Sequence, residues 1–86
     1  MAFNVTLKPS AQKALLKLPR PLQTRILDSL ESLTNNPRPV GVKKLQSVTD
    51  LYRIRIGDYR VIYSINDHEL LIYVLTVGHR REVYRD

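Results

Sequence analysis

The sequence contains no cysteine, and this absence excludes two common devices of small proteins. Without thiols the chain can form no disulfide and can offer no thiolate ligand to a metal ion. Its two histidines lack acidic residues at ligand spacing, and two imidazoles alone make a poor metal site. We therefore expect neither a metal ion nor any other cofactor.

Long apolar runs are missing as well. No stretch approaches the roughly 20 apolar residues of a membrane-spanning helix. The first residues also lack the basic-then-apolar pattern of a secretory signal. A cytoplasmic protein without a membrane partner is the expectation. With 43% hydrophobic and 26% charged residues and no repeats, the 86 residues predict a single domain spanning 1–86.

Acidic residues are few, and the formal net charge of +6 with a pI near 10.0 favours a polyanionic partner. Residues 1–42 carry six Lys/Arg against two Asp/Glu, and residues 43–86 carry eight against six. The second half is therefore not the richer one in net charge. Net charge supports only non-specific binding, so the arrangement of the cations matters more than their number.

The first half of the chain has the pattern of a strand followed by two helices. "FNVTL" at 3–7 alternates as a short strand does, and "KPSAQKALLKL" at 8–18 has helical spacing after the start signals Pro9 and Ser10. Pro19 and Pro21 interrupt this helix. A second helix follows with five aliphatic residues on one side: Leu22, Ile26, Leu27, Leu30 and Leu33.

After the loop sequence "TNNPRPVG" at 34–41 the apolar period changes from 3.6 to 2. Strands are predicted at about 44–46, 51–56, 59–65 and 70–77, with turns at 57–58 and 66–68. The fold class is therefore α+β. We expect a short N-terminal strand, a two-helix hairpin packed on one face of a mainly antiparallel sheet, and a basic C-terminal tail.

The stretch "LYRIRIGDYRVIY" at 51–63 places three arginines among aromatic and β-branched residues. If Gly57 and Asp58 form a two-residue hairpin loop of type II′, Arg55 lies opposite Arg60. Side chains alternate along each strand, so Arg53, Arg55 and Arg60 share one side of the sheet, here called the arginine face. The other side then carries the residues that pack on the helices: Tyr52, Ile54, Ile56, Tyr59, Val61 and Tyr63.

Like charges directly opposite one another destabilise a strand pair, so the arginine face would gain from a bound anion. Arginine presents a planar fork that matches phosphate, which favours phosphate binding over a purely solubilising role. That solubilising role is the alternative. Lys43 and Lys44 precede the strand and are either a solvated pair or an extension of this positive surface.

The tail "VGHRREVYRD" at 77–86 is also basic, and the predicted strand ends before it releases His79, Arg80, Arg81, Tyr84 and Arg85. Tyr84 can stack on a base, bond a phosphate through its hydroxyl, or fold back onto the core. His79 has the side chain whose pKa suits proton transfer near neutrality, although a solvated loop histidine is the alternative. His68, in a polar turn, is interpreted as structural.

The segments "KLQSVTDLYRIRIGDYRVIY" and "VGHRREVY", with the order of elements, resemble the RelE branch of the RelE/ParE toxin superfamily over essentially the whole chain. The resemblance implies a bacterial toxin that enters the ribosomal A site. There it cuts mRNA without a metal ion, using the nucleotide's own 2′-hydroxyl and leaving a 2′,3′-cyclic phosphate. It also implies a RelB-like antitoxin as partner, with operator DNA contacted only through the toxin–antitoxin complex.

The same resemblance assigns roles to individual residues. Arg53 and Arg55 stand where the family places basic residues at the scissile phosphate, Arg60 matches the arginine of the family's "YRVIY"-like stretch, and Arg80 and Tyr84 match its tail. Arg81 and Arg85 are expected to bind RNA, together with Lys43 and Lys44.

The sequence departs from the family where other members carry lysines at the positions of Arg53 and Arg55, one of them a proposed general base. Arginine stays charged and is a poor base. Either His79 transfers the proton, or catalysis rests on charge stabilisation and alignment.

Two other functions remain open from the sequence. The ParE side of the same superfamily binds DNA gyrase instead of cutting RNA, and the fold alone does not separate the two. A non-catalytic nucleic-acid-binding module is also compatible with the charge. Neither alternative uses three arginines that share a face together with a terminal Arg and Tyr.

Overall fold

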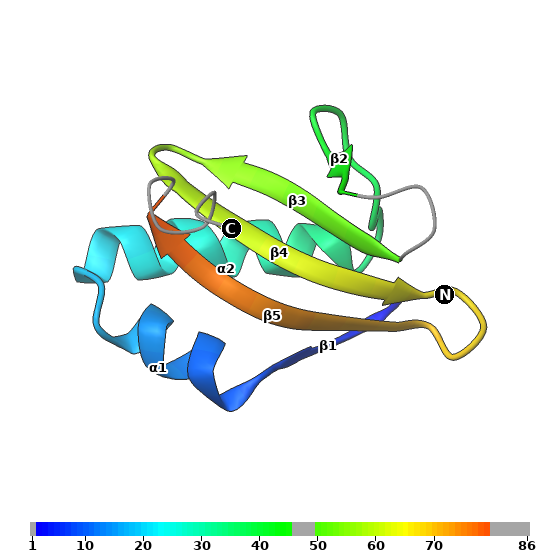
Figure 1. Cartoon of the computed structure of the whole chain (residues 1–86), viewed down its shortest axis with the longest axis horizontal. Helices are drawn as coiled ribbons and strands as arrows, with labels where there is room; N and C mark the ends of the chain where they lie inside the picture. Colours follow the sequence, from blue (N-terminus) through cyan, green and yellow to red (C-terminus); the bar gives the residue numbers. More distant parts are fainter. Residues whose placement is uncertain (1, 46–49, 80–86) are drawn as a thin grey trace.

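The computed structural model describes residues 2–45 and 50–79. The elements are β1 (Asn4–Leu7), α1 (Pro9–Leu16), α2 (Arg20–Leu33), β2 (Lys43–Lys44), β3 (Leu51–Ile56), β4 (Tyr59–Asn66) and β5 (Leu71–His79). The strands form one sheet in the order β1-β5-β4-β3-β2 (Figure 1). β1 runs parallel to β5, and the other described pairs are antiparallel. The predicted α+β fold is confirmed.

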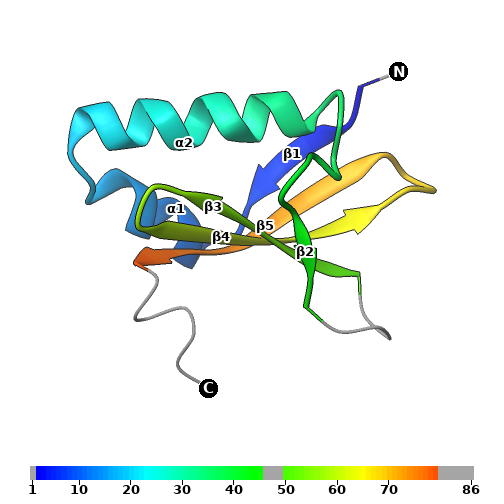
Figure 2. The same cartoon turned by 90° about the horizontal axis from the view of Figure 1, so that it is seen from above.

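The two helices are consecutive in the chain and pack against different parts of the sheet. α2 lies across one face of the sheet, and α1 packs beside β5 (Figures 1 and 2). The core fills the space between them and consists of aliphatic residues from both helices and of alternate residues from β3, β4 and β5. Each fully buried aliphatic side chain contributes about 1.5–3 kcal/mol to folding.

α1 starts at Pro9, where a missing N–H costs nothing because the first N–H groups of a helix have no partner within it. Ala11 and Leu15 are its buried residues. At its end, the Gln23 side chain donates hydrogen bonds from Nε2 to the carbonyl oxygens of Leu16 at 3.2 Å and Leu18 at 2.7 Å. α2 thus satisfies carbonyls that the end of α1 leaves open.

α2 buries Ile26, Leu30 and Leu33, as its spacing predicts. Leu27 was expected on the same side, but it is 48% exposed. Successive residues of a helix are turned by about 100°, so Leu27 lies a quarter turn away from the stripe that Ile26 and Leu30 define. None of the helices in residues 2–45 and 50–79 combines the length and apolarity needed to cross a membrane.

The strands differ from their predicted bounds at the ends. β2 covers Lys43–Lys44 instead of 44–46, and β5 starts at Leu71 because Leu70 has a left-handed backbone with φ of 55°. β5 also contains a bulge, since Ile62 pairs with Thr76 while Tyr63 pairs with Val74, which leaves Leu75 as the extra residue. The strand then continues to His79, two residues beyond the predicted end.

Candidate functional site

The register of β3 and β4 forms the arginine face. Arg55 lies opposite Arg60, and Arg53 lies opposite Ile62, which is two residues from Arg60 on the same strand. Directly opposed residues of an antiparallel pair point to the same side, as do residues two apart. The intervening residue Ile54 belongs to the core. The predicted pairing of the arginines and the division into two sides are therefore confirmed.

The turn between β3 and β4 sets this register. Gly57 has a φ of +61°, and Asp58 is not among the positive-φ residues of the described chain, which is the combination of a type II′ turn. A Cβ atom at residue 57 would lie 3.5 Å from Nη1 of Arg25, so a side chain from α2 sits beside the turn. Glycine at 57 is required by the backbone, and the turn holds Arg55 opposite Arg60.

The three arginines differ in exposure. Arg55 is exposed, and its Nε donates a long hydrogen bond of 3.4 Å to the carbonyl oxygen of Gly57. Arg53 is half-buried, whereas Arg60 is only 5% exposed. Arg60 is therefore the least accessible of the three arginines. Its strand is central, with Arg55 on one neighbouring strand and Gly78 on the other.

β2 adds one of the two predicted lysines to the arginine face. Lys43 lies opposite Arg53 and is exposed, so it shares the side of the three arginines. Lys44 lies opposite Tyr52, and its Nζ is 5.9 Å from the centre of that ring. Lys44 therefore lies on the other side of the sheet.

His79 is not brought to the arginine face. It pairs with Tyr59, and the two rings meet edge to face with 5.5 Å between their centres. Tyr59 in turn lies opposite the buried Ile56, so both rings are on the helix side of the sheet. The expectation that the strand ends before His79 and releases it with the tail is wrong. The other predicted tail residues lie outside the described residues: Arg80, Arg81, Tyr84 and Arg85.

An arginine that sequence reasoning did not single out makes the best-defined polar contacts. Arg38, in the loop after α2, donates hydrogen bonds from Nη1 and Nη2 to the carboxylate of Asp67 at 3.1 and 2.8 Å. Its Nε donates to the hydroxyl of Tyr52 at 3.1 Å. We call Arg38, Tyr52 and Asp67 the Arg38 clasp. No local sequence pattern predicts the Arg38 clasp, because its residues come from a loop, a strand and a turn far apart in the chain.

The clasp shifts the pKa values of Arg38 and Asp67. The hydrogen bonds to Asp67 and Tyr52 raise the pKa of Arg38, and the hydrogen bond from Arg38 lowers the pKa of Asp67. Beside the clasp, the Tyr63 hydroxyl donates a 2.7 Å hydrogen bond to the carbonyl oxygen of Pro37, and burial raises the pKa of Tyr63. These contacts fasten the loop before β2, and therefore Lys43, to the sheet.

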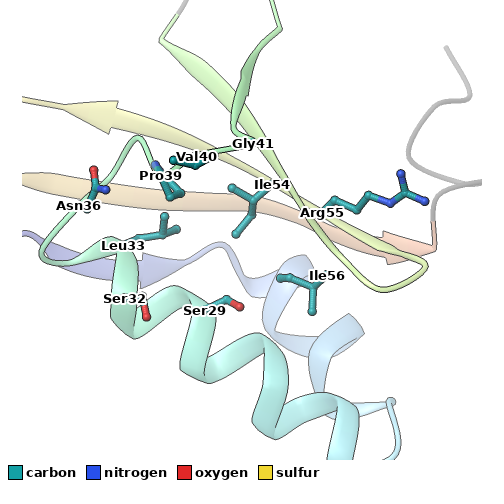
Figure 3. A pocket seen from close by; sticks show the side chains of 10 residues that line it. All are labelled: Ser29, Ser32, Leu33, Asn36, Pro39, Val40, Gly41, Ile54, Arg55 and Ile56. Carbon is teal, nitrogen blue, oxygen red and sulfur yellow. The ribbon is translucent and has the colours of Figure 1, made fainter.

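A hollow of about 320 Å³ lies between α2, the loop at 36–41 and β3. Figure 3 shows Ile54 and Ile56 directed toward α2, while the Arg55 side chain extends away from them. Leu33 and Pro39 make further parts of the lining apolar. The hollow is an opening at the edge of the core on the helix side, and Arg55 is the residue of the arginine face that borders it.

The fold is that of toxins from toxin–antitoxin systems. The chain belongs to the family described as ParE toxin of type II toxin–antitoxin system, parDE, whose model matches residues 5–84. This places it in the RelE/ParE toxin superfamily, as its sequence predicts.

Its relatives include toxins named RelE and RelG. The chain is 28% identical to the mRNA interferase toxin RelE of Escherichia coli, over 100% of this chain and 94% of that one. It is 28% identical to the toxin RelG of Mycobacterium tuberculosis, over 99% of both. The toxin in a crystal structure of an archaeal RelE–RelB complex from Pyrococcus horikoshii superposes with a TM-score of 0.85 and 36% identity, over 100% of both chains.

Proposed function

We propose that this chain is a RelE-type toxin that cuts mRNA in the A site of the ribosome, and hence in the cytoplasm. The observation that carries the proposal is the arginine face, where the register aligns Arg53, Arg55 and Arg60 and adds Lys43. A relative of 28% identity bears the name mRNA interferase, which supports the same activity. Clustered guanidinium groups suit the phosphate backbone of RNA.

The reaction needs no nucleophile from the protein. The 2′-oxygen of a nucleotide attacks the adjacent phosphorus, the bond from phosphorus to the 5′-oxygen breaks, and a 2′,3′-cyclic phosphate remains. The 2′-hydroxyl loses its proton, and the departing 5′-oxygen gains one. In this scheme Arg55 and Arg53 neutralise the charge that develops on the phosphate, and the ribosome holds the nucleotide in line for attack.

The proton transfer is the step to which the arginines contribute least. A guanidinium is a poor base, so Arg53 and Arg55 stabilise charge without accepting the proton. His79, on the helix side beside Tyr59, faces away from them. We therefore propose catalysis by charge stabilisation and alignment. Arg80 and Tyr84 remain predicted contributors from the tail, with Arg81 and Arg85 as RNA-binding residues.

We further propose a RelB-like antitoxin as the partner that restrains this activity. The solved relative from Pyrococcus horikoshii is a complex of RelE with RelB, and the positive charge of this chain suits an acidic partner. The antitoxin then blocks the arginine face. Operator DNA would be contacted only through this complex.

Translating ribosomes provide the test. Purified protein added to them should produce cuts in ribosome-bound message, detected by primer extension, and the same message without ribosomes serves as the control. The family model carries the ParE name, so DNA gyrase is the competing target. Continued protein synthesis together with lost supercoiling by gyrase would replace the nuclease with a ParE-like activity. Binding to the message without cuts or loss of supercoiling would instead indicate a non-catalytic nucleic-acid-binding module.

A further inference from the structure

Positive charge also gathers on the helical side of the molecule, where the proposed cleavage does not use it. The first 27 residues contain no Asp or Glu and carry five cations: Lys8, Lys13, Lys17, Arg20 and Arg25. All five are exposed. They lie on α1, at its two ends and on the first half of α2, and the Arg25 guanidinium reaches the turn at Gly57.

Two of these cations border a groove of about 610 Å³ between α1 and the adjoining ends of β4 and β5. We call it the basic groove. Lys13 and Lys17 line it from the helix, Ala14, Leu18 and Val77 give it an apolar lining, and Tyr59 stands at the strand end with His79. The groove therefore combines an apolar surface with two ammonium groups.

The two lysines are arranged in a way that favours an acidic ligand. They are four residues apart, so they lie on the same side of α1 and repel one another. Neither takes part in the ion pairs found among residues 2–45 and 50–79. A helix C-terminus attracts cations, which accounts for lysines at this end of α1 but not for the apolar surface beside them. Carboxylates above the groove would offset the repulsion.

The apolar lining also decides which kind of polyanion fits. A phosphodiester backbone gains little from Ala14, Leu18 and Val77, whereas an amphipathic peptide buries apolar side chains against them. The basic groove lies on the helix side of the sheet, at the end of β4 that carries Tyr59, and the arginine face lies on the opposite side of the same strand. Tyr59 borders the groove, and the next residue, Arg60, belongs to the arginine face. A peptide anchored in the groove would pass around this end of the sheet to reach the arginine face.

We propose that the basic groove is a docking site for an acidic amphipathic segment of the antitoxin. Apolar side chains of that segment pack on Ala14, Leu18 and Val77, and its carboxylates pair with Lys13 and Lys17. The proposal rests on the proposed toxin–antitoxin function and adds a location to it. Anchoring and inhibition are then separable, because the lysines that hold the antitoxin are not the arginines that cut RNA.

The test is the double variant Lys13→Glu/Lys17→Glu, with the product of the gene adjacent to this chain's own as the antitoxin probe. Reversal turns two attractions into repulsions, so the dissociation constant measured by calorimetry should rise at least about 30-fold. Cleavage on ribosomes and the melting temperature should stay as in the wild type. The matched control Lys8→Glu/Arg20→Glu changes the same charge outside the groove and should bind the antitoxin as the wild type does.

Three results would overturn the docking site. The first is antitoxin affinity within threefold of the wild type, as expected if the antitoxin instead covers the exposed Leu16 and Leu27. The second is lost ribosome binding with antitoxin affinity intact, which would assign the groove to ribosomal RNA. The third is an equal loss of affinity in both double variants. This test measures binding, so its outcome is independent of cleavage. If the wild-type protein cuts no message but still needs Lys13 and Lys17 to bind the antitoxin, the proposed nuclease activity is refuted and the proposed docking site is supported.

Discussion

Arg38, in the loop after α2, and Arg55, on β3, are two arginines with opposite surroundings. Arg38 is 42% exposed by its side chain, yet its guanidinium donates three hydrogen bonds, two to Asp67 and one to Tyr52. Arg55 is exposed and donates one long hydrogen bond to a backbone carbonyl of its own hairpin. The guanidinium of Arg38 uses its donors within the protein and fastens a loop. The guanidinium of Arg55 has N–H donors left for a phosphate.

Arg60 is a third case, since it lies opposite Arg55 but is buried. A buried side chain contributes to packing through its aliphatic stem even when its charged end serves a site. The comparison therefore predicts three outcomes: lost cleavage for Arg55, lost cleavage and stability for Arg60, and lost stability for Arg38.

The largest effect is expected for Arg55→Ala. Loss of one charge-stabilising donor should lower the single-turnover cleavage rate on ribosomes by about 100-fold, while thermal unfolding is unchanged. Arg38→Ala is the matched control, and it should lower the melting temperature while each folded molecule cuts at the wild-type rate. If Arg38→Ala instead abolished cleavage and Arg55→Ala lowered the melting temperature, Arg38 would be the catalytic arginine and Arg55 the structural one.

Arg60→Ala should reduce both the stability of the fold and the rate of cleavage. Truncating this buried side chain removes packing within the sheet, so the free energy of unfolding should fall by about 1–3 kcal/mol in urea titrations. Cleavage per folded molecule should fall as well, because the charge opposite Arg55 is lost. Unchanged stability would mean that Arg60 resembles Arg55, and unchanged cleavage would leave it a purely structural residue.

A smaller effect separates the two lysines of β2. Lys43→Gln should weaken binding of a fluorescently labelled single-stranded RNA several-fold at low salt and make the salt dependence of log Kd shallower by about 0.7. Lys44→Gln should leave the anisotropy titrations unchanged, because Lys44 lies beside Tyr52 on the other side of the sheet. Equal losses from both lysines would show that charge alone, and not the face, determines RNA binding.

The smallest effect concerns Asp67 and pH. Arg38 lowers the pKa of Asp67 in the folded protein, so the stabilisation is present above the unfolded pKa of about 3.9 and is lost as pH falls through the lower folded value. Asp67→Asn should therefore melt slightly below the wild type at pH 7, and the gap should close at the lowest pH. Melting curves that stay parallel across the acid range would show that the pair contributes no linkage.

Much of the fold and the register of the arginines were predictable from local patterns. Gly57 and the alternation in 51–63 define the hairpin, and the hairpin fixes the partner of Arg55. The burial of Arg60 was not predictable in this way, because it depends on the neighbouring strand, where Gly78 lies opposite. The Arg38 clasp escaped prediction for a related reason, since its partner Asp67 is 29 residues away.

His79 shows how one irregularity changes a site. Alternation counted from the buried Ile72 and Val74 would put residue 79 on the arginine face. The bulge at Leu75 reverses the alternation in the rest of β5, so Val77 is buried and His79 turns toward Tyr59. No glycine or proline marks residues 71–77 as irregular. The sequence therefore left this histidine as a candidate base that the structure places elsewhere.

The central claim is that the arginine face drives the 2′-hydroxyl of a ribosome-bound message onto its own phosphate. The most direct measurement compares single-turnover cleavage of two messages that differ only at the scissile nucleotide, one with the 2′-hydroxyl and one with 2′-hydrogen. The account predicts cleavage of the first message, with a 2′,3′-cyclic phosphate at the new end, and none of the second. Cleavage of the 2′-deoxy message would contradict it, since water or a protein group would then be the nucleophile.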